Sequence, residues 1–436
     1  MKLVYVSQPY DRLFPPEQNS IGLIVYYTAL ELSRHFEIVV YGRHYRDDTV
    51  PDDLPFVVRR FPVWLDRILL RFLRQFPHAA RWLRLDGMAA GHHHYSREVR
   101  RSLANDRPDL VHVMNSWNWC RGLKSTGASP RIVLEMQCEW LSQRDHGEVA
   151  RQLEAVDAVV TVSDHVRREF NAAFPSYPGI VETVGNGVDV SHFEPGADLT
   201  RPVGKTGRKI LFVGRVSPEK GLHTLIEAFS EVADTLGDVE LLLAGPRASL
   251  SFDFVTSLSS DKRVLALGRF YDQAGRSTYH EHLDELVIRY GLSGRVRFIG
   301  NVSHKELVAA YQEADIVVNP SLSESFGISV VEAMACGVPV VGTRVGGMCE
   351  SVLNGTTGIL VEPDAPGELA RAILSVLEDP ARMREMGIEG RKRAVALYSW
   401  GARAERLAGI YERLSAESRY GLPGQQRSQP APSKQV

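Results

Sequence analysis

Short runs of β-branched and apolar residues alternate with helical patterns along almost the whole chain, and this alternation restricts the fold more than any other feature of the sequence. It predicts an α/β architecture in which parallel strands are covered by helices on both faces. In the first half the predicted strands are Leu3–Val6, Glu37–Tyr41, Asp109–Met114, Arg131–Met136, Asp157–Val162 and Ile180–Val184. In the second half they are Lys209–Val213, Val239–Ala244, Val296–Ile299, Asp315–Asn319 and Val338–Gly342.

The chain has 436 residues, which is too long for one ordinary core and suits two domains of roughly 200 residues each. A stretch rich in Gly, Pro and charge, without apolar periodicity, separates the two sets of strands. We therefore predict an N-terminal domain over residues 1–193, a linker over 194–208 and a C-terminal domain over 209–397. The final residues are rich in Gln, Ser, Pro and Lys, so a disordered tail is expected over 417–436.

Charge and cysteine content restrict the function classes. Lys plus Arg is 51 and Asp plus Glu is 53, a net charge of −2 that argues against a nucleic-acid binder. The four cysteines lack the spacing of a zinc or redox site and are too few for a disulfide framework, which favours a cytoplasmic protein. The N-terminal apolar run is too short for a signal peptide, and no apolar run reaches the roughly 18 residues of a membrane span.

The most informative stretch runs from Asn319 to Met334, where a polar loop joins a strand to a helix expected to begin near Phe326 or Gly327. A helix start offers free backbone N–H groups at the positive end of the helix dipole, which suits phosphate or sugar hydroxyls. Glu324 lies in the loop and Glu332 follows eight positions later, so the two carboxylates can reach two parts of one elongated ligand. Taken alone, the pattern also fits a helix-capping Glu324 and a solvated Glu332.

A second strand-to-helix loop, from Phe212 to Gly221, carries two cations five residues apart, Arg215 and Lys220. Arg offers a planar fork to phosphate oxygens and Lys a point charge. Cations placed there would stabilise the negative charge that a diphosphate gains as it leaves. The alternative is a surface Arg and Lys, but a Lys at a helix start opposes the helix dipole, which favours an anionic partner.

Two glycine turns complete the set: Val184–Asp189, which contains Asn186-Gly187, and Val345–Gly347, with Glu350 close behind. Together the four stretches resemble the retaining glycosyltransferases of family 4, whose GT-B fold has two Rossmann-like domains facing a cleft. The family's E-x7-E signature matches Glu324 and Glu332, its G-R-x-x-x-E-K-G loop matches Gly214 to Gly221, and its N-G-V-D turn matches Asn186 to Asp189. The resemblance covers about residues 1–416 and is strongest over 181–363.

The resemblance implies a role for each matching residue. Arg215 and Lys220 would hold the donor diphosphate, Glu324 would contact hydroxyls of the transferred sugar, and Glu332 would accept hydrogen bonds from the ribose. Further donor contacts are implied at Gly214 and at the backbone of Phe326, Gly327 and Ile328.

The same resemblance implies transfer of a sugar from a nucleotide-diphosphate donor, UDP-linked first and GDP-linked next, with retention of configuration. The acceptor would be a glycan, a lipid-linked molecule or a small molecule. No metal and no further cofactor are expected, and the chain contains no D-x-D motif, the usual metal-diphosphate ligand of the other main glycosyltransferase fold. A C-terminal helix over 398–416 should cross back onto the N-terminal domain.

The N-terminal half departs from the family pattern. Only Gly22 remains of a frequent Gly-Gly pair, and Gln137 stands where many members place a His that contacts the donor sugar. Gln can donate a hydrogen bond but cannot titrate, which keeps a second reading open: a weak or inactive nucleotide-sugar-binding protein. The predicted lining residues of this half are Gly22, His112, Asn115, Glu135, Gln137 and Asn186, although a mid-strand His112 equally fits a core position. A nicotinamide-dependent oxidoreductase would need G-x-G-x-x-G after the first strand, which Ser7–Tyr10 lacks.

One segment mixes Arg with Leu, Phe and Trp, from Trp64 to Phe76 and on to Arg84. This basic amphipathic pattern suits peripheral contact with an anionic membrane, here the inner face of the cell membrane. The alternative is an ordinary helix that packs its apolar stripe on the N-terminal domain.

Overall fold

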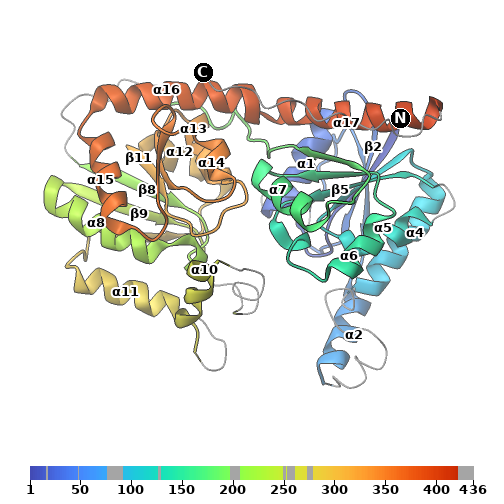
Figure 1. Cartoon of the computed structure of the whole chain (residues 1–436), viewed down its shortest axis with the longest axis horizontal. Coiled ribbons are helices and arrows are strands. Elements are labelled where there is room, and N and C mark those ends of the chain that lie inside the picture. Colours follow the sequence, from blue (N-terminus) through green and yellow to red (C-terminus); the bar gives the residue numbers. More distant parts are fainter. Residues whose placement is uncertain are drawn as a thin grey trace.

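The computed structural model describes residues 1–15, 18–47, 49–75, 92–125, 129–196, 207–248, 252, 261–272 and 278–420. Two α/β domains lie side by side, and a pair of long helices runs along one side of both (Figure 1). Both sheets are parallel with helices on their two faces, so the predicted fold class is confirmed.

The N-terminal sheet has, within the described residues, the strand order β3-β2-β1-β4-β5-β6-β7. Its strands are β1 (Lys2–Val6), β2 (Glu37–Arg43), β3 (Val57–Phe61), β4 (Leu110–Met114), β5 (Arg131–Met136), β6 (Ala158–Thr161) and β7 (Ile180–Thr183). Its helices are α1 (Ser20–Leu32), α2 (Trp64–Gln75), α4 (His93–Asp106), α5 (Cys120–Lys124), α6 (His146–Leu153) and α7 (Asp164–Ala173), with short 3-10 turns at Trp117–Trp119 and Glu139–Leu141. The central strand β1 pairs with β2 on one side and β4 on the other, and helices cover both faces, so nearly every residue of β1 and β4 is buried and most are apolar.

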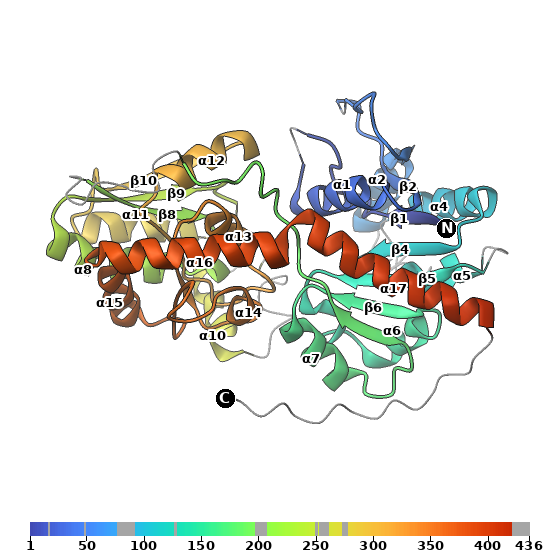
Figure 2. The ribbon, with the colours of Figure 1, turned by 90° about the horizontal axis from the view of Figure 1, so that it is seen from above.

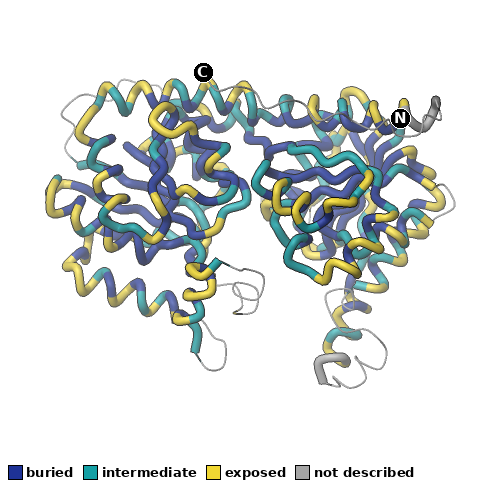
Figure 3. Tube along the Cα trace, in the orientation of Figure 1, coloured by how far each residue is buried: buried dark blue, intermediate teal, exposed yellow. Residues whose placement is uncertain are grey.

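The C-terminal sheet has the order β10-β9-β8-β11-β12-β13 among the described residues. Its strands are β8 (Arg208–Val213), β9 (Val239–Ala244), β10 (Val296–Gly300), β11 (Ile316–Asn319), β12 (Val340–Thr343) and β13 (Gly358–Val361). Its helices are α8 (Leu222–Leu236), α10 (Lys262–Ala266), α11 (Tyr279–Arg289), α12 (His304–Glu313), α13 (Ile328–Ala335), α14 (Met348–Ser351), α15 (Pro366–Leu377) and α16 (Pro380–Tyr398), with 3-10 turns at Pro218–Lys220 and Leu267–Phe270. Buried residues follow the strands through the centre of each domain (Figure 3).

Two strands were missed by the sequence prediction, β3 and β13, and both lie at sheet edges. β3 has the sequence VVRRF, in which more exposed and less exposed residues alternate. It therefore lacks the continuous apolar run of a central strand. β13 is four residues long and begins with Gly358, which weakens any strand propensity.

The last helix, α17 (Trp400–Tyr420), continues the line of α16 but packs on the N-terminal domain (Figure 2). Its inward side chains, among them Trp400, Leu407 and Ile410, are buried in the core that contains β1 and α1. This is the predicted crossover, and α17 continues past the predicted end at residue 416. Residues 197–206 of the predicted linker and 421–436 of the predicted tail lie outside the described residues.

Helix α2 projects from the body of the N-terminal domain (Figure 1). It is anchored by Asp66, which is 1% exposed and accepts hydrogen bonds from the backbone N–H of His94 and Tyr95 at 2.8 and 3.0 Å. The apolar side chains of Trp64 and Ile68 are 57% and 58% exposed, so they do not pack on the domain. The rest of the predicted amphipathic segment, residues 76–84, lies outside the described residues. Among the described helices, none is both long and apolar enough to cross a membrane.

Candidate active site

A cavity of about 640 Å³ lies between the two domains and is lined by both. Loops that follow β8 and β11 form its C-terminal wall, and loops that follow β1, β4, β5 and β7 form its N-terminal wall. All of these loops leave the carboxyl ends of parallel strands, where open α/β sheets bind ligands.

The two loops of the C-terminal wall are tied to each other. Gly221 has a φ of 67°, and a Cβ there would lie 2.2 Å from the carbonyl oxygen of Pro320, so a side chain at this position would push the loops apart. The backbone N–H of Leu322 also donates to the carbonyl of Glu219 at 2.8 Å. This docking brings the predicted diphosphate loop against the predicted sugar loop.

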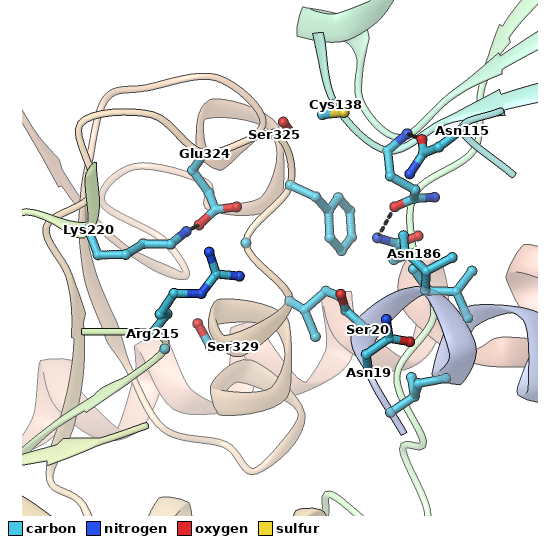
Figure 4. Close-up of a pocket in the computed structure, with 18 of the residues that line it drawn as sticks. Asn19, Ser20, Asn115, Cys138, Asn186, Arg215, Lys220, Glu324, Ser325 and Ser329 are labelled. Atoms are coloured by element: carbon cyan, nitrogen blue, oxygen red, sulfur yellow. Dashed lines mark hydrogen bonds and ion pairs between the residues drawn. The ribbon is translucent and has the colours of Figure 1, made fainter. Parts of the chain in front are cut away.

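As a result, Lys220 and Glu324 form an ion pair, with Nζ 2.6 Å from Oε2 (Figure 4). Burial lowers the pKa of Lys220, but Glu324 and Glu219 raise it by more, so the ammonium stays charged. Arg215 lies beside this pair with an exposed side chain (Figure 4). The wall thus presents one exposed guanidinium and one ammonium already held by a carboxylate.

Helix α13 points its N-terminus at the cavity, since Phe326, Gly327 and Ile328 all line it. The loop before it is held by the second predicted glycine turn, because the N–H of Gly347 donates to the carbonyl of Glu324 at 2.9 Å. The free N–H groups of the first helical turn therefore face the ligand space.

Glu332 lines the same cavity from within α13 and is 6% exposed. Its Oε2 accepts a hydrogen bond of 2.8 Å from the hydroxyl of Tyr311, and its Oε1 lies 3.8 Å from Nε2 of His304. Burial raises the pKa of Glu332 to about 7, against the opposing effect of the Tyr311 hydroxyl. Near neutral pH the group therefore exists in both protonation states.

Amides form the N-terminal wall at Asn115, Gln137 and Asn186. The backbone N–H of Gln137 donates to Oδ1 of Asn115 at 2.8 Å, and Nδ2 of Asn186 donates to Oε1 of Gln137 at 2.7 Å. Oδ1 of Asn186 is buried and has no hydrogen-bond partner among the described residues. An unpaired buried acceptor in a cavity suits a ligand hydroxyl.

Three predicted lining residues do not reach the cavity: Gly22, His112 and Glu135. His112 and Glu135 are both 0% exposed, because their side chains point from β4 and β5 toward α17, where they contact Tyr411 and Arg403. Gly22 lies in α1 with its α-carbon against the preceding loop, where a Cβ would be 1.7 Å from the carbonyl oxygen of Arg12. Its role is to allow this close approach.

The sequence prediction missed much of the N-terminal wall, including Gln8, Tyr10, Asp11, Asn19, Ser20 and Trp140. Asp11 organises the loop, accepting from Oγ of Ser7 at 2.7 Å and from Nδ2 of Asn19 at 3.0 Å. Asn19 also caps α1, because its Oδ1 accepts from the N–H of Gly22 at 2.9 Å. A helix-capping Asn after the first strand is the signal that would have pointed to this loop.

Glu350, in the turn-and-helix motif predicted at 345–350, forms a contact between the two domains. Its carboxylate accepts hydrogen bonds from the backbone N–H of Asp164 and His165 at 2.6 and 2.7 Å. These two residues begin α7 of the other domain, so a C-terminal carboxylate occupies the positive end of an N-terminal-domain helix. Nε2 of His165 also lies 2.7 Å from Oε1 of Glu139, so the contact between the domains extends to the loop after β5.

Within the described ranges, no three His, Cys, Asp or Glu side chains are grouped so that they could hold a metal ion.

Solved structures share this architecture along nearly the whole chain. Sucrose-phosphate synthase from Thermosynechococcus elongatus superimposes with a TM-score of 0.71 at 23% identity, over 95% of this chain and 99% of that one. HepE from Anabaena, solved in complex with UDP and glucose, superimposes with a TM-score of 0.66 at 19% identity, over 94% of this chain and 99% of that one. At these identities the likeness establishes the fold.

Curated relatives are closer in sequence but longer than the matched part. D-inositol 3-phosphate glycosyltransferase 2 of Catenulispora acidiphila is 33% identical over 60% of this chain, which covers 57% of that protein. Alpha-maltose-1-phosphate synthase of Mycolicibacterium smegmatis is 33% identical over 61% of this chain and 65% of that protein.

Family models match both halves of the chain. Residues 21–192 match the model described as glycosyltransferase family 4, and residues 200–393 match the model described as glycosyl transferases group 1. These ranges coincide with the two domains whose walls form the cavity, and the chain therefore belongs to the family 4 glycosyltransferases of GT-B fold.

Proposed function

We propose that this protein is a glycosyltransferase that moves a sugar from a nucleoside-diphosphate donor, UDP-linked in the first place and GDP-linked in the second, to a hydroxyl-bearing acceptor. The observation that carries the proposal is the composition of one cavity. Arg215, the Lys220–Glu324 pair and Glu332 stand on one wall, opposite neutral amides on the other. Binding of UDP and glucose by HepE, a structural neighbour, supports UDP as the first choice.

In this proposal Arg215 and Lys220 hold the diphosphate, Glu324 contacts the transferred sugar, and Glu332 accepts from the ribose hydroxyls. The bond between the anomeric carbon and the diphosphate oxygen breaks, and a bond to the acceptor oxygen forms on the same face of the sugar. The acceptor proton passes to the leaving phosphate, whose growing charge the two cations stabilise. No metal takes part, so activity should persist in EDTA.

The direct test is calorimetry with UDP, GDP and UDP-glucose, followed by an assay of slow donor hydrolysis with and without EDTA. We expect UDP and UDP-glucose to bind, and UDP-glucose to be hydrolysed at the same rate in chelator. Failure of both nucleoside diphosphates to bind would contradict the proposal. Loss of activity in EDTA, restored by Mg²⁺, would contradict its metal-free part.

One observation favours a second candidate function, a nucleotide-sugar-binding protein with little or no activity. Gln137 stands where many family members carry a titratable His, and an amide cannot take up a proton. The two functions separate in the same experiments, since a pure binding protein would bind UDP-glucose without hydrolysing or transferring it.

For the location we propose a cytoplasmic protein that contacts an anionic membrane through α2. Trp64 and Ile68 face away from the domain beside Arg67 and Arg71, the arrangement of an interfacial helix. The protein should sediment with anionic vesicles, be released by salt and ignore neutral vesicles. Trp64→Ser/Ile68→Ser should abolish sedimentation, whereas Ile288→Ser, at a position 72% exposed on the other domain, should not. Equal recovery with both vesicle types would contradict membrane contact.

A further inference from the structure

Behind the N-terminal wall lies a buried charge pair that the proposed reaction does not use. Nη2 of Arg403, on α17, donates to both oxygens of Glu135, on β5, at 2.8 and 2.7 Å. The two side chains are 1% and 0% exposed. Arg403 also bonds Oγ1 of Thr28 and the carbonyls of Val184 and Gly185, so it connects the crossover helix to α1 and to the loop that leads to Asn186.

The pair is in contact with the cavity wall through one side chain. Nε2 of Gln137 donates to Oε1 of Glu135, and Oε1 of Gln137 accepts from Nδ2 of Asn186. A chain of hydrogen bonds thus runs from Arg403 through Glu135 and Gln137 to Asn186, whose remaining oxygen is the buried acceptor without a partner.

The direction of every bond in this chain follows from its first member. A guanidinium has only donors and stays protonated, so Glu135 can only accept. Gln137 must then turn its nitrogen to Glu135 and its oxygen to Asn186, and Asn186 must use its nitrogen there. Only this order leaves an oxygen of Asn186, rather than its NH₂ group, without a partner among the described residues.

The charges around Glu135 keep it an acceptor. Burial raises the pKa of Glu135, but Arg403 and His112 lower it to about 2. Nε2 of His112 lies 3.0 Å from Oε2, and burial lowers the pKa of His112, which favours the uncharged ring. Nδ1 of His112 lies 2.7 Å from the hydroxyl of Tyr411, which in turn lies 2.5 Å from that of Tyr5. Without Arg403, a buried Glu135 would tend to protonate and become a hydrogen-bond donor. The side-chain amide of Gln137 would then have to turn its oxygen, rather than its nitrogen, toward Glu135.

We propose that Arg403 is a positioning residue of the sugar site, which acts through Glu135 to fix the amide orientation of Gln137 and so presents Oδ1 of Asn186 as an acceptor for a hydroxyl of the bound sugar. The inference rests on the proposed function only for the identity of the ligand. It assigns a role in the cleft to a residue on the crossover helix, far from both donor motifs in sequence.

The test uses a variant that removes the pair as a whole, Arg403→Met/Glu135→Leu. Replacing both partners of a buried ion pair with apolar residues is close to neutral for stability, so this protein should fold where a single Arg403→Met would leave a buried charge. The matched control is Arg413→Met/Glu182→Leu, which removes an exposed ion pair of 2.5 Å between the same helix and the same domain. Thermal melting confirms folding of both.

The first readout is independent of activity. In protein labelled with ¹⁵N in glutamine side chains, the Gln137 signal is identified by its loss in Gln137→Ala. We expect that signal to be distinct and slowly exchanging in the natural protein and in the control, and to move to the position of a free amide in the pair variant. An unmoved signal in the folded pair variant would overturn the proposal.

The second readout is turnover of UDP-glucose in a double-mutant cycle. The pair variant should lower kcat for hydrolysis about three- to tenfold, the loss expected when one neutral hydrogen bond to the reacting sugar is displaced, with KM within about twofold. In a Gln137→Ala background the same pair variant should change kcat by less than about twofold. An equal loss in both backgrounds would show a merely structural role and overturn the proposal. If the natural protein does not hydrolyse UDP-glucose, the proposed activity on this donor fails, and the Gln137 signal alone decides the positioning role.

Discussion

The two walls of the cleft are built from different chemistry. The C-terminal wall carries Arg215, Lys220 and Glu324, and it takes them from loops that lie a few residues from a strand end. The N-terminal wall carries Asn115, Gln137 and Asn186, whose orientations depend on one another and on α17. Charge is concentrated where a diphosphate would lie, and neutral amides where sugar hydroxyls would lie.

Charged and neutral contacts differ in how precisely their side chains must be positioned. A charged contact acts over several ångströms and tolerates small shifts of the side chain. A hydrogen bond from an amide works only at one distance and one orientation, so it needs a supporting network. Variants of the charged wall should therefore have large effects on rate, and variants of the amide wall smaller ones.

The largest effect is expected from the diphosphate cations. Arg215→Ala and Lys220→Ala should each cost about 2–4 kcal/mol of transition-state stabilisation, a roughly 30- to 10³-fold loss of kcat/KM for the donor, because each removes charge stabilisation of the leaving group. Initial rates against donor measure this, with circular dichroism as the fold control. Lys209→Ala, which removes a half-buried lysine of β8 paired with Glu313 of α12, should behave like the natural protein. A folded double Ala variant with a near-normal rate would show that the charged wall has another purpose.

The second prediction separates the two carboxylates of this wall. Glu332→Gln should weaken binding of both free UDP and intact donor by about 1.5–3 kcal/mol, the value of a hydrogen bond to a charged group. Glu324→Gln should leave UDP affinity nearly unchanged yet depress transfer strongly, because the proposed contact of Glu324 exists only when the sugar is present. Calorimetry with UDP and with the full donor distinguishes them. Equal loss of UDP affinity in both variants, with unchanged turnover, would assign the pair a structural role.

A third prediction concerns pH. Burial raises the pKa of Glu332 to about 7, so the free protein holds this group partly protonated near neutrality. Ribose hydroxyls bond best to the carboxylate, so nucleotide binding should release a proton and affinity should rise with pH up to about 7 and then level off. The gain is at most about tenfold per pH unit. The same titration with Glu332→Gln corrects for ionisation of the phosphates, and an identical pH dependence in the two proteins would exclude Glu332 as the titrating group.

The smallest effect is expected at the amide wall. Asn186→Ala removes one neutral hydrogen bond to Gln137 and the free acceptor, so turnover should fall by about 0.5–1.5 kcal/mol while UDP affinity stays the same. Rates at saturating donor and calorimetry with UDP give both numbers. A loss in UDP affinity as large as that in Glu332→Gln would mean that Asn186 faces the nucleotide and that the division between the walls is misplaced.

The sequence predicted one wall far better than the other, for a physical reason. Lys220 and Glu324 each lie in a short loop between a strand and a helix, so local sequence determines where they stand. Their ion pair was still unexpected, since it depends on the docking of two loops through Gly221 and Pro320. Local sequence motifs therefore predict where a residue lies on its own loop, whereas contacts between two loops can be known only from the folded structure.

The N-terminal wall shows the limit of local reasoning. Strand periodicity places His112 and Glu135 correctly on β4 and β5, but it does not tell which face of a sheet buried on both sides meets the cavity. The side chain of Glu135 faces Arg403, which lies 268 positions further along the chain. The sheet edges were missed for local reasons, because β3 buries few of its side chains and β13 has only four residues and begins with Gly358.

The path of α17 has a consequence for biogenesis. The helix is made last, yet Trp400, Leu407 and Ile410 fill the core of the domain that is made first. On the ribosome, the N-terminal domain must therefore wait with an apolar groove open along α1 until the whole C-terminal domain has emerged. At roughly 5–20 residues per second this interval lasts on the order of ten to several tens of seconds, during which the growing chain is a natural client for chaperones.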